Sequence, residues 1–283
     1  MNDWQQYEVW NGGQQHTVTG IVRVLPDLYS PQLGNRRPLL VYLPPSYHSQ
    51  SDRRFPVIYM HDGQNLFDAA TSFAGEWQVD ETFLGLAAEG VEAIVVGLPN
   101  MAEARTDEYS PFRDQRLKMG GDGEAYITFL AETVKPLIDG TFRTQPQPEH
   151  TGIMGSSMGG LISLYGFFQR PDVFGLAGVM SPAFWFAGNA ILDYVRRADF
   201  VPGRIYMDVG TAEMAPPRGI FRYLPFLRPY YRTASQQMER ELIRKGYMPG
   251  QTLRYVEELD GEHNEAAWAR RLPAALRFLL AAV

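Results

Sequence analysis

The sequence predicts an α/β fold in which a mostly parallel central sheet is covered by helices on both faces. Short runs rich in Val, Leu and Ile alternate with amphipathic segments along most of the 283 residues, and this alternation is typical of right-handed strand–helix–strand units. Several runs are apolar throughout, as expected for strands that helices cover on both sides. No internal repeat, low-complexity tract or linker divides the chain, so we expect one domain over residues 1–283.

The individual elements follow from the apolar pattern and from the Pro and Gly residues that bound it. Runs rich in β-branched and aromatic residues between turn residues indicate strands at residues 18–25, 39–43, 55–60, 93–98, 175–180, 204–209 and 253–259, and at the short run that starts near Thr151. Apolar residues at three- and four-residue steps indicate helices at residues 77–88, 123–139, 234–245 and 265–282, and after Gly160.

Composition and charge exclude several classes of protein. The net charge is −6 and no long basic run occurs, so a nucleic-acid partner is not expected. The absence of cysteine rules out disulfides, zinc–thiolate sites and a cysteine nucleophile. The N-terminus lacks a basic segment followed by an apolar one, and the run from Leu276 to Val283 is too short to span a bilayer. We therefore expect a cytoplasmic protein without a membrane partner, although a mature form whose leader has been removed would look the same.

One stretch carries the strongest chemical signal. Residues 155–159, Gly-Ser-Ser-Met-Gly, follow a short apolar run and precede an amphipathic segment, and they fit the G-x-S-x-G nucleophile elbow of α/β-hydrolases. In that turn the central serine is strained, and the residues two positions before and after it must be small. This spacing selects Ser157, because a turn centred on Ser156 would place Met154 and Met158 at the glycine positions. The amides of the following helix point at the site, where negative charge develops during acyl transfer.

Chain order identifies the candidate base. Enzymes of this architecture order their triad as serine, acid and then histidine, and the histidine follows the last strand. His263 occupies that position. Every other histidine precedes the serine: His16, His48, His61 and His150. His263 is therefore the only histidine that fits the order, and its alternative role is that of a polar turn residue that caps the final helix.

The acid of the triad should follow the strand that precedes the last one. Glu213 lies in the loop after the strand at residues 204–209, whereas Asp208 lies within that strand. A carboxylate on a loop can reach an imidazole, but one within a strand points along the sheet normal into a helix layer. We therefore favour Glu213, with Asp208 as the second choice and Asp260 as the third. A solvated loop charge is the alternative role of Glu213.

An oxyanion hole requires two backbone amides. The first is that of Met158, directly after the serine, and the second should come from the loop after the third strand. That loop begins His61-Asp62-Gly63-Gln64, and we assign the Gln64 amide, with Gly63 allowing the backbone to approach the substrate. A tight strand-to-helix turn is the alternative, and the two are compatible. The His61–Asp62 pair has no third ligand nearby in sequence, so we expect neither a metal nor another cofactor.

Six short segments match one known pattern together. They are HDGQNLF (61–67), EYSP (108–111), GSSMGG (155–160), SPAFW (181–185), GTAE (210–213) and GEHN (261–264). Together they resemble the esterase D family, which is similar to feruloyl esterases and enterochelin esterases. The resemblance runs from about residue 36 to the end and implies an α/β-hydrolase fold without a large helical cap. By the family pattern Ser157 and His263 are the motif serine and histidine. Many relatives have Asp where this chain has Glu213, which keeps Asp208 as an alternative.

The resemblance and the candidate triad predict a serine carboxylesterase that acts on a small-molecule ester, with short-acyl, aryl or sugar esters as substrates. An acyltransferase with the same triad is one alternative, because mycolyl transferases are similar to this family, and a trilactone siderophore esterase is another. A non-catalytic binding protein would have a broken triad. Phe184, Trp185 and Phe186 either wall the site or pack in the core.

An unusual segment follows the acid loop. Residues 214–232 contain four arginines, five aromatic residues and four prolines, and no carboxylate. We expect a non-helical excursion at about residues 214–233. Its aromatic side chains, Phe221 and Tyr223 among them, either cover the mouth of the site and bind substrate or form a surface or homodimer contact.

Overall fold

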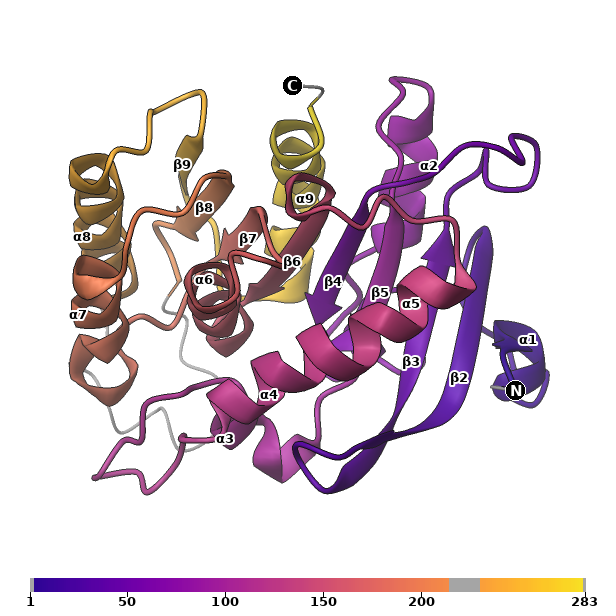
Figure 1. Cartoon of the computed structure of the whole chain (residues 1–283), viewed down its shortest axis with the longest axis horizontal. Coiled ribbons are helices and arrows are strands. Elements are labelled where there is room, and N and C mark those ends of the chain that lie inside the picture. Colours follow the sequence, from indigo (N-terminus) through magenta and orange to yellow (C-terminus); the bar gives the residue numbers. More distant parts are fainter. Residues whose placement is uncertain (1–2, 214–229, 282–283) are drawn as a thin grey trace.

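The computed structural model describes residues 3–213 and 230–281 and contains a nine-stranded sheet (Figure 1). Its strands are β1 Gln5–Gln6, β2 Ile21–Ser30, β3 Asn35–Leu43, β4 Val57–His61, β5 Ile94–Leu98, β6 Thr151–Ser156, β7 Leu176–Met180, β8 Arg204–Gly210 and β9 Leu253–Glu258. They lie in the order β1-β2-β3-β5-β4-β6-β7-β8-β9. Strands β1, β2 and β3 form antiparallel pairs, and the strands from β5 to β9 are parallel to one another, so the predicted mostly parallel sheet is confirmed.

Helices cover both faces of this sheet. They are α1 Tyr7–Trp10, α2 Val79–Ala87, α3 Arg105–Glu108, α4 Gly123–Phe129, α5 Lys135–Thr141, α6 Met158–Gln169, α7 Ala190–Arg197, α8 Tyr230–Lys245 and α9 Glu265–Leu279. In Figure 1, α4, α5 and α6 lie in front of the strands. These helices pack with α7 and α8 into one core, whereas α1, α2 and α9 contribute to a second core on the opposite face.

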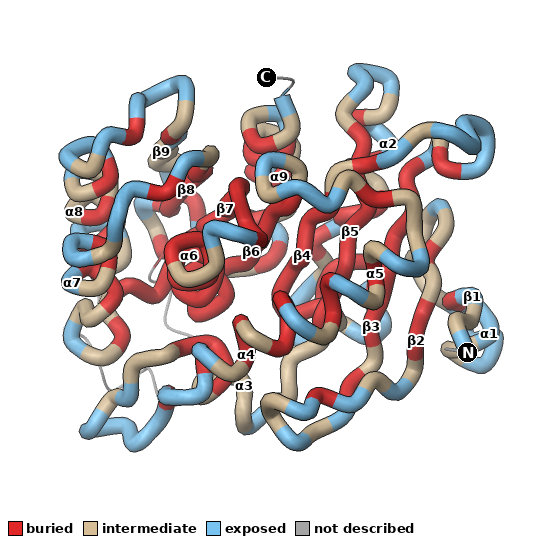
Figure 2. Tube along the Cα trace, viewed as in Figure 1, coloured by how far each residue is buried: buried red, intermediate tan, exposed pale blue. Residues whose placement is uncertain are grey.

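The two cores follow from the alternation of side chains along each strand. In β3, Val41 belongs to the first core and Tyr42 to the second, and in β4 the same holds for Tyr59 and Met60. Successive side chains of a strand point to opposite faces, so a continuous apolar strand supplies both cores at once. The central strands are accordingly buried along their length (Figure 2).

The strand order places the loops after β4 and β6 at a topological switch point. After β4 the chain moves to β5 on one side, and after β6 it moves to β7 on the other. In open α/β sheets, ligands bind at such a point, outside the carboxyl ends of the strands. The loop after β4 begins at Asp62 and the loop after β6 contains Ser157. The fold therefore brings these two segments to one edge of the sheet.

Proline explains two differences from the predicted elements. The sequence predicts a strand that ends at Leu25, before Pro26, but β2 continues to Ser30 because the register shifts before Leu28. Such an irregularity accommodates a residue that cannot donate to the ladder. The predicted helix at residues 123–139 contains a π-helical turn, Leu130–Val134. It directly precedes the turn with Pro136, whose ring and missing N–H disfavour a regular α-helical turn.

Other elements had no sequence signal. The four-residue helices α1 and α3 and the eight-residue helix α7 are too short for an extended apolar repeat. Residues 214–229 lie outside the described residues, so the predicted excursion at 214–233, with Phe221 and Tyr223, stays a prediction; α8 begins at Tyr230. No helix within the described ranges combines the length and apolar character needed to cross a bilayer.

Candidate active site

The turn between β6 and α6 is a strained elbow. Ser157 connects the two elements with φ 57° and ψ −120°, which costs a non-glycine residue about 1–3 kcal/mol. A Cβ atom added at Gly155 would lie 3.0 Å from the carbonyl carbon of Gly159 and 2.8 Å from Cδ2 of His61, so close packing explains the glycine positions. The strained residue is Ser157 and not Ser156, which is the buried last residue of β6.

Glu213 and His263 are in direct contact. Oε2 of Glu213, which is 5% exposed, lies 2.5 Å from Nδ1 of His263. Glu213 follows β8, and His263 lies between β9 and α9. The two loops meet at glycines: a Cβ atom at Gly210 would lie 2.0 Å from the carbonyl oxygen of Gly261, and the Ala212 amide donates to that oxygen at 2.9 Å. This close backbone approach positions the carboxylate against the imidazole.

Ser181 orients the carboxylate of Glu213. Its Oγ accepts hydrogen bonds from Nε1 of Trp268 at 2.9 Å and from Nη2 of Arg271 at 2.8 Å. Because these donors use the acceptor positions of the hydroxyl, its proton is directed at Oε1 of Glu213, 2.6 Å away. The amide of Gly210 donates to the same oxygen at 2.5 Å. Two donors therefore hold Oε1, and Oε2 is left for the imidazole.

Asp208, the second candidate for the acid, has different partners. Its Oδ1 accepts the backbone amide of Ser181 at 3.1 Å. Nε of Arg271 lies 3.2 Å from its Oδ2, but without hydrogen-bond alignment. Burial raises the pKa of Asp208 to about 7, although Arg271 opposes the shift. The structure thus pairs Glu213, and not Asp208, with His263.

The loop after β4 reverses direction at Asp62, which has φ 54°. Within the described ranges, the amides of Gln64 and Met158 form no backbone hydrogen bond, so both are available as donors. A Cβ atom at Gly63 would lie 2.6 Å from the carbonyl carbon of Gly97. Close contact with β5 therefore gives one reason for this glycine, and the predicted approach of the backbone to a substrate stays a prediction.

A partly buried ion pair lies beside this loop. Arg105 donates from Nε and Nη2 to Oδ1 and Oδ2 of Asp62 at 2.7 and 2.8 Å, and Asn100 donates to Oδ1 at 2.6 Å. Oδ2 of Asp62 lies 3.7 Å from the position of a Cβ atom on Gly159, and so beside the first turn of α6. Burial acts to raise the pKa of Asp62, but Arg105 and Asn100 outweigh it and lower the pKa. The carboxylate stays ionised, and Arg105 supplies the compensating charge.

Tyr231, in the first turn of α8, contacts both the serine and the histidine. Its ring centroid lies 4.7 Å from that of His263 and 6.0 Å from that of Trp185. Burial raises the pKa of Tyr231 to about 12, and the neighbouring side chains of Trp185 and Ser157 partly oppose this shift. No direct hydrogen bond joins the Ser157 hydroxyl to His263 in the described part of the chain. Tyr231 therefore contacts both the candidate nucleophile, Ser157, and the candidate base, His263.

The aromatic run after β7 divides between the site and the core. Trp185 is partly exposed and packs against Tyr231. Phe184 and Phe186 are 1% and 2% exposed and belong to the core around α6. Of the two roles that the sequence leaves open for Phe184, its burial supports packing in the core. The amide of the preceding residue donates to the carbonyl oxygen of Ser157 at 2.9 Å, which brings the chain against α6 and places the phenylalanine ring in the core.

His61 and Asp62 have separate partners. The Nδ1 atom of His61 forms a hydrogen bond with the hydroxyl of Tyr126 at 2.8 Å, and the ring packs against Tyr109 at 5.2 Å. Burial lowers the pKa of His61 to about 3, so the imidazole is neutral at pH 7. Asp62 is bound by Arg105 instead. The two side chains therefore do not act as a pair.

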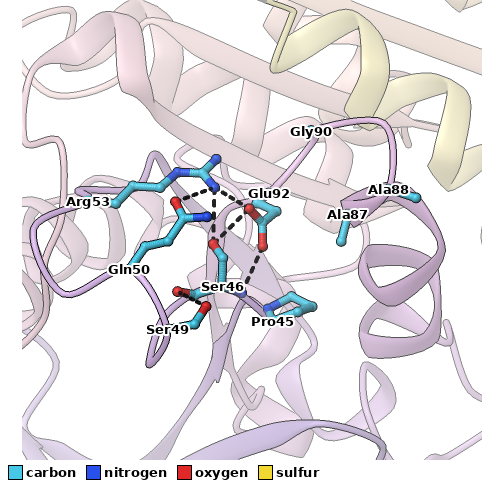
Figure 3. A pocket seen from close by; sticks show the side chains of 9 residues that line it. All are labelled: Pro45, Ser46, Ser49, Gln50, Arg53, Ala87, Ala88, Gly90 and Glu92. Carbon is cyan, nitrogen blue, oxygen red and sulfur yellow. Dashed lines mark hydrogen bonds and ion pairs between the residues drawn. The ribbon is translucent and has the colours of Figure 1, made fainter.

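A surface pocket lies at the amino ends of β4 and β5 (Figure 3). The charged side chains that line this pocket form hydrogen bonds and an ion pair with their neighbours. Glu92 accepts from the amide and the hydroxyl of Ser46 at 3.0 and 2.8 Å and pairs with Arg53. Since the candidate triad lies beyond the carboxyl ends of the parallel strands, we assign this pocket no role in the reaction.

Several residues of the site were given no role from the sequence, although some of them lie in the segments that carry the resemblance. Ser181 meets Trp268 and Arg271 from 87 and 90 residues away, and Arg105 meets Asp62 from 43 residues away. Two signals for Ser181 were available: it begins the segment SPAFW (181–185), and it directly follows β7, beside the elbow strand, where the carboxyl ends of parallel strands meet at one edge. Tyr231 is one of the five aromatic residues of segment 214–232, for which the sequence predicts either a role over the site or a surface contact.

Comparison with known proteins identifies the family. The family model described as "Putative esterase" matches residues 30–279, which is most of the chain. The chain belongs to this esterase family. It is a carboxylic ester hydrolase, as the sequence predicts. This esterase is 27% identical over 253 residues to the uncharacterized protein YbbA of Bacillus subtilis (strain 168), a match that covers 87% of this chain and 93% of YbbA. It is 26% identical over 196 residues to the siderophore triacetylfusarinine C esterase of Aspergillus fumigatus, covering 64% of each.

Solved structures share the fold of this esterase. The BES protein from Bacillus cereus matches with a TM-score of 0.71 and 20% identity over 95% of this chain and 98% of its own. The enterobactin esterase FES from Shigella flexneri matches with a TM-score of 0.68 and 17% identity over 93% of this chain and 60% of its own. The predicted α/β-hydrolase fold class is confirmed.

Proposed function

We propose that this esterase is a serine carboxylesterase in which Ser157 is the nucleophile, His263 the general base and Glu213 the acid. The observation that carries the proposal is the 2.5 Å contact between Oε2 of Glu213 and Nδ1 of His263. Tyr231 contacts both this histidine and Ser157, whose turn is strained. A carboxylate bound at Nδ1 fixes the imidazole tautomer that has a free Nε2, and it stabilises the imidazolium that forms during the reaction.

The proposed reaction proceeds through an acyl-enzyme. His263 takes the proton of the Ser157 hydroxyl as Oγ bonds to the ester carbonyl carbon. The tetrahedral intermediate collapses when the imidazolium returns that proton to the departing alcohol, which leaves the acyl group on Oγ. Water then gives a proton to His263 and attacks the acyl carbon, and the return of the proton to Oγ releases the carboxylic acid. The atoms balance as one ester and one water converted to one acid and one alcohol.

Two amides are proposed to bind the oxyanion of the intermediate, those of Met158 and Gln64. Their support is that neither forms a backbone hydrogen bond within the described residues and that they belong to the loops after β6 and β4, which meet at the switch point. Met158 is also the first residue of α6, whose positive dipole end favours negative charge. The site thus offers fixed donors where charge develops.

We expect Arg105 to support catalysis by compensating the negative charge of Asp62. Arg105→Met leaves the ionised Asp62 carboxylate beside the oxyanion loop, so we expect kcat/KM to fall about 10- to 100-fold. Asp62→Asn alone should cost less. The double variant should recover most of the activity lost in Arg105→Met, because the uncompensated charge is gone. Ester hydrolysis by the three variants, with circular dichroism to confirm folding, measures this.

The control for that experiment is Arg277→Met. Arg277 also binds a carboxylate through two hydrogen bonds, to Glu89 at 2.7 Å each, but at the surface. Its loss should leave kcat/KM unchanged. If the double variant is no more active than Arg105→Met, the electrostatic explanation is wrong and the arginine holds the loop in place instead.

For the substrate, we propose an ester with an aromatic group, of the feruloyl or siderophore type. Tyr231 contacts Ser157 and Trp185 packs on Tyr231, and rings of this kind stack on aryl groups. Curated relatives support the siderophore type, since two of them are named siderophore esterases. Residues 214–233 stay candidates for a lid or for a homodimer contact.

Trp185→Ala tests the substrate class. We expect kcat/KM for a feruloyl sugar and for a trilactone siderophore to fall about 3- to 10-fold, the effect of one lost aromatic contact, while methyl butyrate is hydrolysed at an unchanged rate. Phe73→Ala is the matched control, because Phe73 is 92% exposed. Equal losses on all three substrates would show that Trp185 supports the fold and not the recognition of aryl groups.

A further inference from the structure

Three carboxylates gather at the start of α2, outside the site described above. Glu76 precedes the helix, and Asp80 and Glu81 lie in its first turn. Each offers one oxygen atom, and these atoms all lie within 4.8 Å of one another. Such crowding of like charge requires compensation.

The compensation does not come from the described residues. Asp80 is fully buried, and its Oδ1 has no hydrogen-bond partner there; the same holds for Oε1 of Glu76 and Oε2 of Glu81. The remaining oxygens of Glu76 and Asp80 are held by neutral donors, the threonines at positions 17 and 19. Each of the three carboxylates therefore has one buried oxygen atom without a hydrogen-bond partner among the described residues.

We propose that Glu76, Asp80 and Glu81 bind a calcium ion. The donor set is made of oxygen atoms alone, which suits a hard cation and not zinc. Two oxygens bound to one Ca²⁺ at about 2.3–2.6 Å are at most about 5 Å apart, and the three oxygens meet this limit. Ca²⁺ accepts an irregular shell of six to eight oxygens, whereas Mg²⁺ demands near-ideal octahedral geometry. Water completes the coordination shell.

The ion would have a structural role. Thr17 binds Glu76 and Asp68, and Thr19 binds Asp80, so a cation held by the carboxylates ties the N-terminal segment to α2. Trp77, directly after Glu76, packs on Trp268 at 5.6 Å between ring centroids. The ion would thereby stiffen the loop behind the residue that hydrogen-bonds Ser181. It makes no contact with the proposed triad and takes no part in the reaction.

The experiment uses the whole chain, freed of metal with a chelator. Calorimetric titration with CaCl2 should give a Kd on the order of 10⁻⁴ M, and 5 mM CaCl2 should raise Tm by about 5 °C. Glu76→Gln/Glu81→Gln should fold but bind Ca²⁺ at least about tenfold more weakly. The control is Asp52→Asn/Glu149→Gln, which changes the net charge equally at exposed positions and should respond as the wild type does.

Two results would overturn the proposal. One is a wild-type Kd above about 10 mM for Ca²⁺, which would mean that protons and not a metal neutralise the cluster. The other is an equal Tm shift in both double variants. Should Glu76→Gln/Glu81→Gln fail to fold, the single variant Glu81→Gln and the wild-type titration decide the question. Tighter binding of Mg²⁺ than of Ca²⁺ would overturn the choice of ion.

Discussion

Replacing Glu213 by glutamine is expected to lower kcat about 10,000-fold, because an amide neither fixes the imidazole tautomer nor stabilises the imidazolium. Asp208→Asn should keep kcat within about tenfold of the wild type. The reason for the difference is contact: Oε2 of Glu213 lies 2.5 Å from the imidazole, whereas Asp208 binds the amide of Ser181. Steady-state hydrolysis of p-nitrophenyl acetate by both variants measures the effect.

The burial of Asp208 also predicts how the stability of the protein depends on pH. Burial raises its pKa to about 7 in the folded protein, above the ordinary 3.8 of an aspartate carboxyl group, so the folded state binds the proton more tightly than the unfolded chain does. Its contribution to the free energy of unfolding is therefore full at low pH and declines as pH rises through about 7. Asp208→Asn should lose less Tm between pH 5 and pH 8 than the wild type. A large loss of kcat in Asp208→Asn together with an active Glu213→Gln would reverse the assignment of the acid.

Replacing Ser157 by alanine is expected to reduce kcat by at least about 10,000-fold, because no nucleophile is left to form the acyl-enzyme. The matched control is Ser156→Ala, one residue earlier, where the side chain is buried at the end of β6 and the backbone is not strained. That variant should keep most of the activity. An active Ser157→Ala protein, or complete loss in Ser156→Ala with the fold intact, would refute the choice of serine.

Much of the fold and part of the site could be predicted because their signals are local. Glycines two residues on either side of Ser157 indicate a tight turn, and Ser157 has the positive φ expected there. The parallel topology then brings the carboxyl ends of the strands to one edge, where Glu213 and His263 meet. Chain order was sufficient for the histidine because no other histidine follows the serine.

The remaining parts depend on contacts between distant segments. Ser181 orients Glu213 only because α9 brings Trp268 and Arg271 against it. A side chain such as Phe184 could line a site or a core, and only the path of the chain along α6 decides for the core. The calcium site proposed above also escapes the sequence pattern, since acidic residues at a helix start are common and their burial is not visible in the sequence.

The central claim is that Ser157 becomes acylated, and labelling with a fluorophosphonate tests it most directly. The reagent phosphonylates an activated serine with loss of fluoride, and peptide mass spectrometry locates the adduct. We predict one adduct per chain, on Ser157, formed in step with the loss of esterase activity and absent from Ser157→Ala. An adduct on Ser156 or on any other residue that accompanies inactivation, or full activity after Ser157 is labelled, would contradict the account.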